Sequence, residues 1–202
     1  MSNNDELWKE ERIRYLKESL VFFSNKEKLA REKWVVGRLL STLGVDFVEA
    51  DLAAAPEPAD VSFGNANFQV KEVCDEHRRR TDEYKEKLEK VKSAKSLRDL
   101  KEQYTPFSIS FTDIVCHCAN YANKLVEENK YGLREVMNID LLCYFNWVNH
   151  NIIEPVEIPN ITTKFRSLSV VSNRYCAVIQ ANERAPNFLK DNIGIVVDYI
   201  KF

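Results

Sequence analysis

Three polar residues around a short β-hairpin could together bind a divalent cation. Asp60 lies at the start of the predicted strand 60–63, and Gln69 and Lys71 lie on the predicted strand 67–73. Carboxylate and carbonyl oxygens are the ligands that Mg²⁺ prefers, usually with several waters. Such a cation activates water and neutralises charge on a phosphoryl oxygen, and an ammonium group can stabilise the transition state. This set therefore predicts a metal-dependent hydrolase, with Asp60 and Gln69 as ligands of Mg²⁺ (or Mn²⁺) and Lys71 as the stabilising charge.

The predicted hairpin brings these side chains to one face. Its two strands flank Gly64-Asn65, which is typical of a tight turn. A two-residue turn places Asp60 opposite Gln69, whereas a four-residue loop over 64–67 places Asp60 opposite Lys71. With either loop the three side chains share one face, because side chains alternate along a strand. The apolar side chains of the hairpin should then point into a core: Val61, Phe63, Phe68 and Val70.

Two further acids could assist the site. Glu32 falls within the apolar stripe of the second predicted helix. A carboxylate on such a stripe must be paired, bind a metal or lie at the rim, so Glu32 is a candidate accessory acid. The alternative is a boundary residue paired with Arg31 or Lys33. Glu72 points to the opposite face of a regular strand and could contribute only with a β-bulge.

A basic segment follows the hairpin. Residues 78–101 include ten basic and five acidic residues. A solvated helix with i,i+4 ion pairs such as Glu83–Lys87 explains most of this segment. Guanidinium groups match phosphate geometry, and phosphate contacts supply most non-specific affinity for nucleic acids. We therefore predict that nucleic-acid contacts come from Arg78, Arg79 and Arg80.

Two other features have simpler explanations. Neighbouring residues of a helix do not share a face, and no second ligand pair follows Cys116-His117-Cys118 at zinc-site spacing. We therefore expect these three residues to pack in the core. His150 lies between two asparagines and is expected in a loop.

Composition sets the remaining limits. The 202 residues are 45% hydrophobic and 11% aromatic, which is enough for one sizeable core. A net charge of −2 argues against a strongly basic coat protein but allows a nucleic-acid enzyme with a local basic footprint. No apolar run approaches the roughly 20 residues of a membrane span, and no secretory signal is visible. Five cysteines without scaffold spacing indicate reduced thiols, so we expect a cytoplasmic protein.

The hydrophobic pattern predicts one α/β domain over residues 1–202, with a central mixed sheet flanked by helices. Helices are expected over 5–23, 26–43, 75–103 and 112–129. A loop is expected over 51–59 and a hairpin over 166–181. Besides the two strands named above, strands are expected over 45–50, 139–148 and 194–200.

The order of a helix glutamate, an acid before a hairpin, and a lysine on the returning strand resembles the PD-(D/E)XK nuclease superfamily. Within it, the chain is similar to an uncharacterised bacterial family of endonucleases. The segments "REKWVVGRLL", "APEPADVSF", "FQVKEVCDEHRRRTDEY" and "RSLSVV" carry this likeness. The resemblance implies a restriction-endonuclease-like fold with a divalent-metal site at one edge of the sheet.

Residue by residue, the resemblance matches Glu32 to the helix acid, Asp60 to the motif aspartate and Lys71 to the motif lysine. Ala59 stands where the motif has proline, a position that only shapes the turn. Gln69 stands where the motif has an acid. A neutral amide is a poorer metal ligand than a carboxylate, so the resemblance implies weaker metal binding unless Glu32 or Glu72 compensates.

Two functions follow from these observations. The first is a Mg²⁺-dependent endonuclease that hydrolyses DNA, as a possible homodimer because duplex cutting usually needs two sites. The second is a non-catalytic module that binds nucleic acid or protein and keeps a degenerate nuclease fold, which Gln69 favours. From spacing alone, the hairpin could also be a solvated one with an Asp–Lys pair worth under about 1 kcal/mol.

Overall fold

The computed structural model describes residues 3–74, 80–100, 106–147 and 150–199. The chain divides into two compact units, residues 1–31 with 76–105, and residues 32–75 with 106–202. Each unit is described by itself. The second unit contains the large sheet and the candidate site, and the single domain expected over residues 1–202 stays a prediction.

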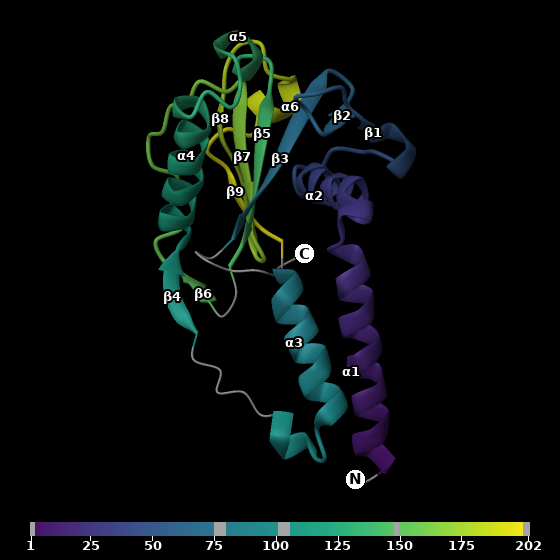
Figure 1. Ribbon diagram of the computed structural model, residues 1–202. Coiled ribbons are helices and arrows are strands. Elements are labelled where there is room, and N and C mark those ends of the chain that lie inside the picture. Colours follow the sequence, from purple (N-terminus) through teal and green to yellow (C-terminus); the bar gives the residue numbers. More distant parts are fainter. Residues whose placement is uncertain (1–2, 75–79, 101–105, 148–149, 200–202) are drawn as a thin grey trace. The chain divides into compact units, whose positions relative to one another are not determined.

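The second unit is built around a mixed sheet of seven strands in the described part of the chain, in the order β1-β2-β3-β5-β7-β8-β9 (Figure 1). Neighbours β3, β5 and β7 run parallel, whereas the other neighbouring pairs are antiparallel. A separate parallel pair joins β4 to β6. The strands are β1 (Ala53–Ala54), β2 (Val61–Phe63), β3 (Ala66–Cys74), β4 (Phe107–Ser110), β5 (Asp140–Asn146), β6 (His150–Ile153), β7 (Ser167–Val171), β8 (Tyr175–Ala181) and β9 (Val196–Asp198).

Two helices cover opposite faces of this sheet, α2 (Lys28–Thr42) and α4 (Phe111–Glu127) (Figure 1). Val36 and Leu39 of α2 share one core with Phe68 of β3. On the other face, α4 shares a second core with Leu141 and Cys143 of β5. Two short helices, α5 (Leu133–Val136) and α6 (Asn187–Lys190), complete the unit. The predicted α/β class, with a central mixed sheet flanked by helices, is confirmed.

The position of β5 in the sheet explains why its sequence is apolar. It lies between β3 and β7, and both of its faces are buried: Leu141 and Cys143 face α4, whereas Leu142 faces α2. A strand that is buried on both faces carries a continuous apolar run rather than an alternating one. The predicted central strand over 139–148 is therefore confirmed.

The hairpin of β2 and β3 adopts the shorter of the two predicted turns. Phe63 pairs directly with Ala66, which leaves Gly64-Asn65 as a two-residue turn. Gly64 has a φ of 54°, in the left-handed region that glycine adopts without a Cβ clash. The four apolar side chains of the hairpin all belong to the α2-side core, as predicted: Val61, Phe63, Phe68 and Val70.

The first unit pairs α1 (Asn3–Phe22) with α3 (Arg80–Ser93), followed by a 3-10 helix (Leu97–Leu100). Its small core contains Leu16, Leu88 and Val91. Glu83 and Lys87 form the predicted ion pair at 2.5 Å. The predicted continuous helix over 75–103 is confirmed over Arg80–Ser93 only, because residues 94–96 are not helical and separate α3 from the 3-10 helix. Residues 75–79 and 101–105 lie outside the described ranges.

The strand predicted over residues 45–50 is wrong. That segment is irregular and ends in a 3-10 helix (Glu49–Asp51). The Asp51 carboxylate accepts a hydrogen bond from the Val48 backbone N–H at 2.8 Å, which removes a donor that a strand ladder would use. The strand that pairs with β2 is β1, which lies within the predicted loop over 51–59.

The loop assignment of His150 is also wrong, since this residue begins β6. Its side chain is buried, and its ring lies 5.7 Å from the Phe145 ring and 6.1 Å from the Phe107 ring. The strands β4 and β6 escaped the sequence analysis because each is short and pairs with a segment about 40 residues away. Among the described residues, no helix has the length and apolarity that a bilayer span requires.

Candidate functional site

Asp60 directly precedes β2, at the point where β2 and β3 stop pairing. Its backbone N–H donates to the Phe68 carbonyl at 2.8 Å, and the residue is 9% exposed. The register of β2 on β3 ends at Phe68. The part of β3 that follows therefore forms an open edge of the sheet within the described residues, and Asp60 lies at the start of that edge.

Asp60 and Gln69 are in direct contact. The Gln69 amide nitrogen donates a hydrogen bond to Asp60 Oδ2, and the Val70 backbone N–H donates to the same oxygen at 3.0 Å. The Gln69 amide oxygen accepts a hydrogen bond from the Tyr131 hydroxyl at 3.2 Å. Gln69 is only 3% exposed. The hairpin geometry predicted for Asp60 and Gln69 is thus observed, with Tyr131 as an additional partner.

Lys71 lies two residues beyond Gln69 on β3 and therefore on the same face of the strand. Its side chain is half-buried. In the ladder with β5, Gln69 is opposite Leu141 and Lys71 is opposite Cys143, whose side chain faces α4. The structure therefore places Asp60, Gln69 and Lys71 on the α4 side of the hairpin.

The two other acids belong to the α2 side. Glu32 is 8% exposed and begins the buried stripe of α2, as the helical periodicity predicted. Glu72 accepts a hydrogen bond from the Asn146 amide at 2.7 Å. Because β3 pairs with β5 without interruption from Phe68 to Cys74, no bulge turns Glu72 toward Gln69 on that side.

The predicted phosphate contacts are mostly outside the described part of the structure. Arg78 and Arg79 belong to the undescribed residues 75–79, and Arg80 is the first residue of α3. Their role stays a prediction from the sequence.

Asp60 is the carboxylate at this edge of the hairpin, and its Oδ2 already accepts two hydrogen bonds. Within the described ranges, no group of three or more His, Cys, Asp or Glu side chains could hold a metal ion. Mg²⁺ does not require one, since it commonly binds through one or two carboxylates, waters and substrate phosphates. In the observed orientation, however, Gln69 presents its nitrogen to Asp60. Rotating the amide by half a turn would present its oxygen instead.

A buried ion pair that the sequence analysis missed supports the same hairpin. Asp140 is fully buried, and Arg166 donates to both of its carboxylate oxygens, at 2.9 Å for the Nε–Oδ1 bond. Ser167 donates its hydroxyl to Oδ1 at 2.8 Å, and the Asn67 backbone N–H of β3 donates to Oδ2 at 2.9 Å. Arg166 also donates to the Asn65 carbonyl in the turn at 3.2 Å. Asp140, the second residue of the apolar run 139–148, was the available sequence signal.

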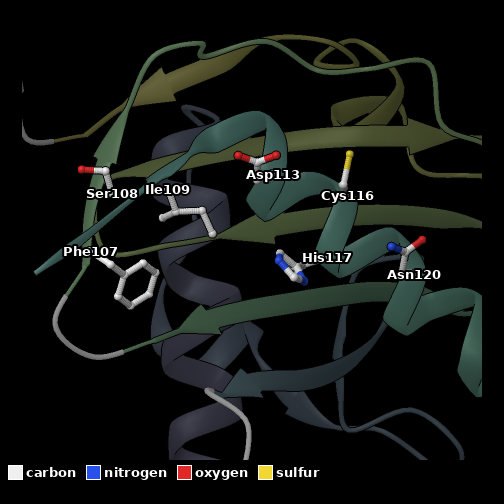
Figure 2. Close-up of a pocket in the computed structure, with 7 residues that line it drawn as sticks. All are labelled: Phe107, Ser108, Ile109, Asp113, Cys116, His117 and Asn120. Carbon is white, nitrogen blue, oxygen red and sulfur yellow. The ribbon is translucent and has the colours of Figure 1, made fainter.

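The Cys-His-Cys segment lies on α4, and only one of its residues is in the core. Cys118 is fully buried, and burial together with a hydrogen bond to Cys143 raises the pKa of its thiol well above the ordinary range. Cys116 is half-buried and His117 is exposed, so the core packing expected for them is wrong. Both line a pocket of about 290 Å³, together with Phe107, Ser108, Ile109, Asp113 and Asn120. Figure 2 shows these seven side chains around the start of α4 and the neighbouring strands.

Comparisons with known proteins give a family and a related structure. No curated protein matches the chain. A solved structure with 25% sequence identity covers 98% of this chain and 96% of its own, with a TM-score of 0.63. It is a protein of unknown function from Pseudomonas aeruginosa strain PAO1, described as a member of the monooxygenase superfamily. A family model matches residues 4–200, almost the whole chain. The chain therefore belongs to the family described as "Putative endonuclease, protein of unknown function (DUF1780)".

Proposed function

We propose that this protein is a restriction-endonuclease-like enzyme that hydrolyses DNA phosphodiester bonds with the help of Mg²⁺ or Mn²⁺. The observation that carries the proposal is the hairpin register, which puts the carboxylate of Asp60 against Gln69 and on the face of Lys71. The family description supports the reaction class. The solved relative is described as a member of the monooxygenase superfamily, which is a different chemistry.

Each residue has a distinct role in this proposal. Asp60 would hold the cation, and Gln69 would be a weaker ligand through its amide oxygen. When bound, a divalent cation activates water and neutralises charge on a phosphoryl oxygen. Lys71 places its ammonium against the phosphate and stabilises the charge that develops there. Glu32 is kept as the accessory acid of this proposal, on the α2 side of the sheet.

The test is the nicking of supercoiled plasmid DNA in Mg²⁺ or Mn²⁺. Asp60→Asn and Lys71→Met are each expected to lower the nicking rate at least about tenfold, which corresponds to about 1.4 kcal/mol of transition-state stabilisation. Asp46→Asn is the matched control, since Asp46 is an exposed acid of the same unit. A parent protein that does not nick, or an Asp60→Asn variant that nicks like the parent, overturns the proposal.

A second function is favoured by Gln69, a neutral amide where the nuclease motif has an acid. In this case the protein is a non-catalytic module that binds nucleic acid or a protein partner. It would leave plasmid DNA intact in either metal while retaining salt-sensitive DNA binding. A nicking parent whose activity depends on Asp60 excludes this second function.

A further inference from the structure

A pocket of about 570 Å³ lies beside α5 and the end of β8, within the second unit. Its volume falls within the range of about 300–1,000 Å³ that is usual for small-molecule sites. The lining combines apolar with polar residues: Leu133, Met137, Phe165 and Ala181, and Thr162, Thr163, Lys164, Gln180 and Asn182. The proposed nuclease reaction assigns no role to any of them.

Hydrogen bonds hold the walls of this pocket together. The Arg166 backbone N–H donates to the Val136 carbonyl at 3.0 Å, which joins the end of α5 to the residue before β7. The Gln180 amide nitrogen donates to the Thr163 carbonyl at 3.3 Å and to the Phe165 carbonyl at 3.0 Å, which ties that segment to β8. Because the pocket is already formed without a ligand, binding requires little ordering of the protein.

Two large apolar side chains of the lining are left in contact with water. Leu133 is 61% exposed and Met137 is 43% exposed, and both line the pocket. They are four positions apart and therefore neighbours on one side of α5. An apolar group bound in the pocket would remove this surface from water, which is favourable in proportion to the area covered.

The polar groups of the pocket favour a negatively charged ligand. Lys164 is exposed and positively charged, and none of the nine lining residues is acidic. Asn182 Oδ1 already accepts a hydrogen bond from the Arg184 backbone N–H at 2.9 Å, so the side chain can offer its nitrogen as a donor. Thr163 is only 8% exposed, and its hydroxyl has no hydrogen-bond partner in the described part of the chain. Buried hydroxyl groups normally have one.

We propose that this pocket binds a small carboxylate with an apolar chain. Leu133 and Met137 cover the chain, and the Lys164 ammonium pairs with the carboxylate. Asn182 and Thr163 supply further donors in the lining, and hydrogen bonds to an ionised acceptor are stronger than neutral ones. An ammonium on the same chain would satisfy the apolar side chains but would be repelled by Lys164. The site goes beyond the proposed nuclease function and does not depend on it.

Decanoate is the probe, and a methionine methyl group reports where it binds. The chain contains only two methionines, Met1 and Met137, and Met137 lines the pocket. NMR of the intact protein with isotope-labelled methionine methyl groups therefore observes the pocket directly. Decanoate is expected to shift the Met137 signal until the site is saturated, which gives a dissociation constant. Decylammonium, with the same chain and the opposite charge, is expected to bind at least about tenfold more weakly.

Two variants test the charged and the apolar part of the pocket separately. Lys164→Met is expected to weaken decanoate binding at least about tenfold, the effect of losing a hydrogen bond to a charged group, whereas Lys164→Arg is expected to retain it. Leu133→Ser is expected to weaken binding about fivefold through lost apolar contact. Both side chains are exposed, so the fold is expected to survive. The matched controls are Lys124→Met and Val48→Ser, which replace exposed residues of the same unit outside the pocket.

Three results overturn the inference. One is a Met137 signal that decanoate leaves unchanged, and another is decylammonium binding as tight as that of decanoate. The third is a Lys164→Met or Leu133→Ser variant that binds decanoate as tightly as its control. A parent protein that binds decanoate in this pocket but does not nick DNA refutes the proposed function alone.

Discussion

Asp140 shows at the scale of one residue how strongly the hairpin depends on a buried charge. The carboxylate is fully buried and accepts hydrogen bonds from Arg166, Ser167 and the Asn67 backbone. A buried ion pair contributes little net stability compared with apolar packing, but removing one partner leaves the other charge buried and unpaired. Asp140 therefore stabilises the fold mainly by compensating the buried charge of Arg166.

We predict that Asp140→Asn lowers the free energy of unfolding by about 3–5 kcal/mol, the usual cost of breaking a buried pair. Urea denaturation measures this change. The control is Glu128→Gln, which removes the exposed pair Lys124–Glu128 at 3.7 Å and should cost under about 1 kcal/mol. Equal losses in the two variants would show that the Asp140 network does not stabilise the fold.

The thiol of Cys176 contributes to the pH dependence of the unfolding free energy. Burial raises the pKa of this thiol from 9.0 to about 12, partly opposed by a hydrogen bond from Thr42 and the charge of Arg38. Below pH 9 the thiol is neutral in both the folded and the unfolded chain. Above that, the unfolded chain loses the proton while the folded chain keeps it, so stability falls as the pH rises toward 12.

Cys176→Ala is therefore expected to flatten the decline of unfolding free energy above pH 9. The slope removed is at most about 1.4 kcal/mol per pH unit. Urea denaturation of parent and variant at a series of pH values measures it. Identical slopes for the two proteins would contradict the assignment to this thiol.

At the scale of elements, the turn between β2 and β3 sets the register that puts Asp60 against Gln69. Gly64 has a φ of 54° and open space where a Cβ would be. Gly64→Ala is expected to cost about 1–2 kcal/mol from backbone strain alone, the cost of a left-handed alanine. The control is Asn65→Ala, because Asn65 is not among the described non-glycine residues with positive φ. Thermal unfolding compares the Gly64→Ala and Asn65→Ala variants. Equal stabilities would show that the left-handed φ of Gly64 does not constrain the turn.

The elements that local pattern determines could be predicted from the sequence. The hairpin strands alternate and flank a glycine-asparagine turn, so β2, β3 and the shared face of Asp60, Gln69 and Lys71 were predicted correctly. The sequence left the loop length open because both lengths satisfy the same alternation. Only the observed pairing of Phe63 with Ala66 decides it.

The features that the sequence did not reveal depend on contacts between distant residues. Tyr131 bonds Gln69 across 62 positions, and Arg166 bonds Asp140 across 26. Neither residue carries a local signal of its partner. The strand predicted over 45–50 failed for a local reason, since the Asp51 carboxylate competes for the Val48 N–H. Such side-chain bonds to the backbone divert a β-prone segment into a turn.

At the scale of the whole molecule, charge is unevenly distributed. The chain has a net charge of −2, yet residues 78–101 hold ten basic and five acidic residues. Attraction to a polyanion therefore cannot come from the overall charge and has to be local. Because each neutralised phosphate releases counterions, the salt dependence of binding reports directly how many phosphates the protein neutralises.

The predicted role of Arg78, Arg79 and Arg80 can be tested through that salt dependence. Replacing all three by alanine should reduce the slope of log K against log salt by about 0.9 for each phosphate that is no longer neutralised, up to about 2.7. Fluorescence anisotropy with a short duplex at several salt concentrations measures the slope. The control replaces three exposed basic residues elsewhere, Lys124, Lys130 and Arg134, and changes the net charge by the same amount. If both triple variants lower the slope equally, DNA responds to total charge, and the arginine cluster does not bind phosphate specifically.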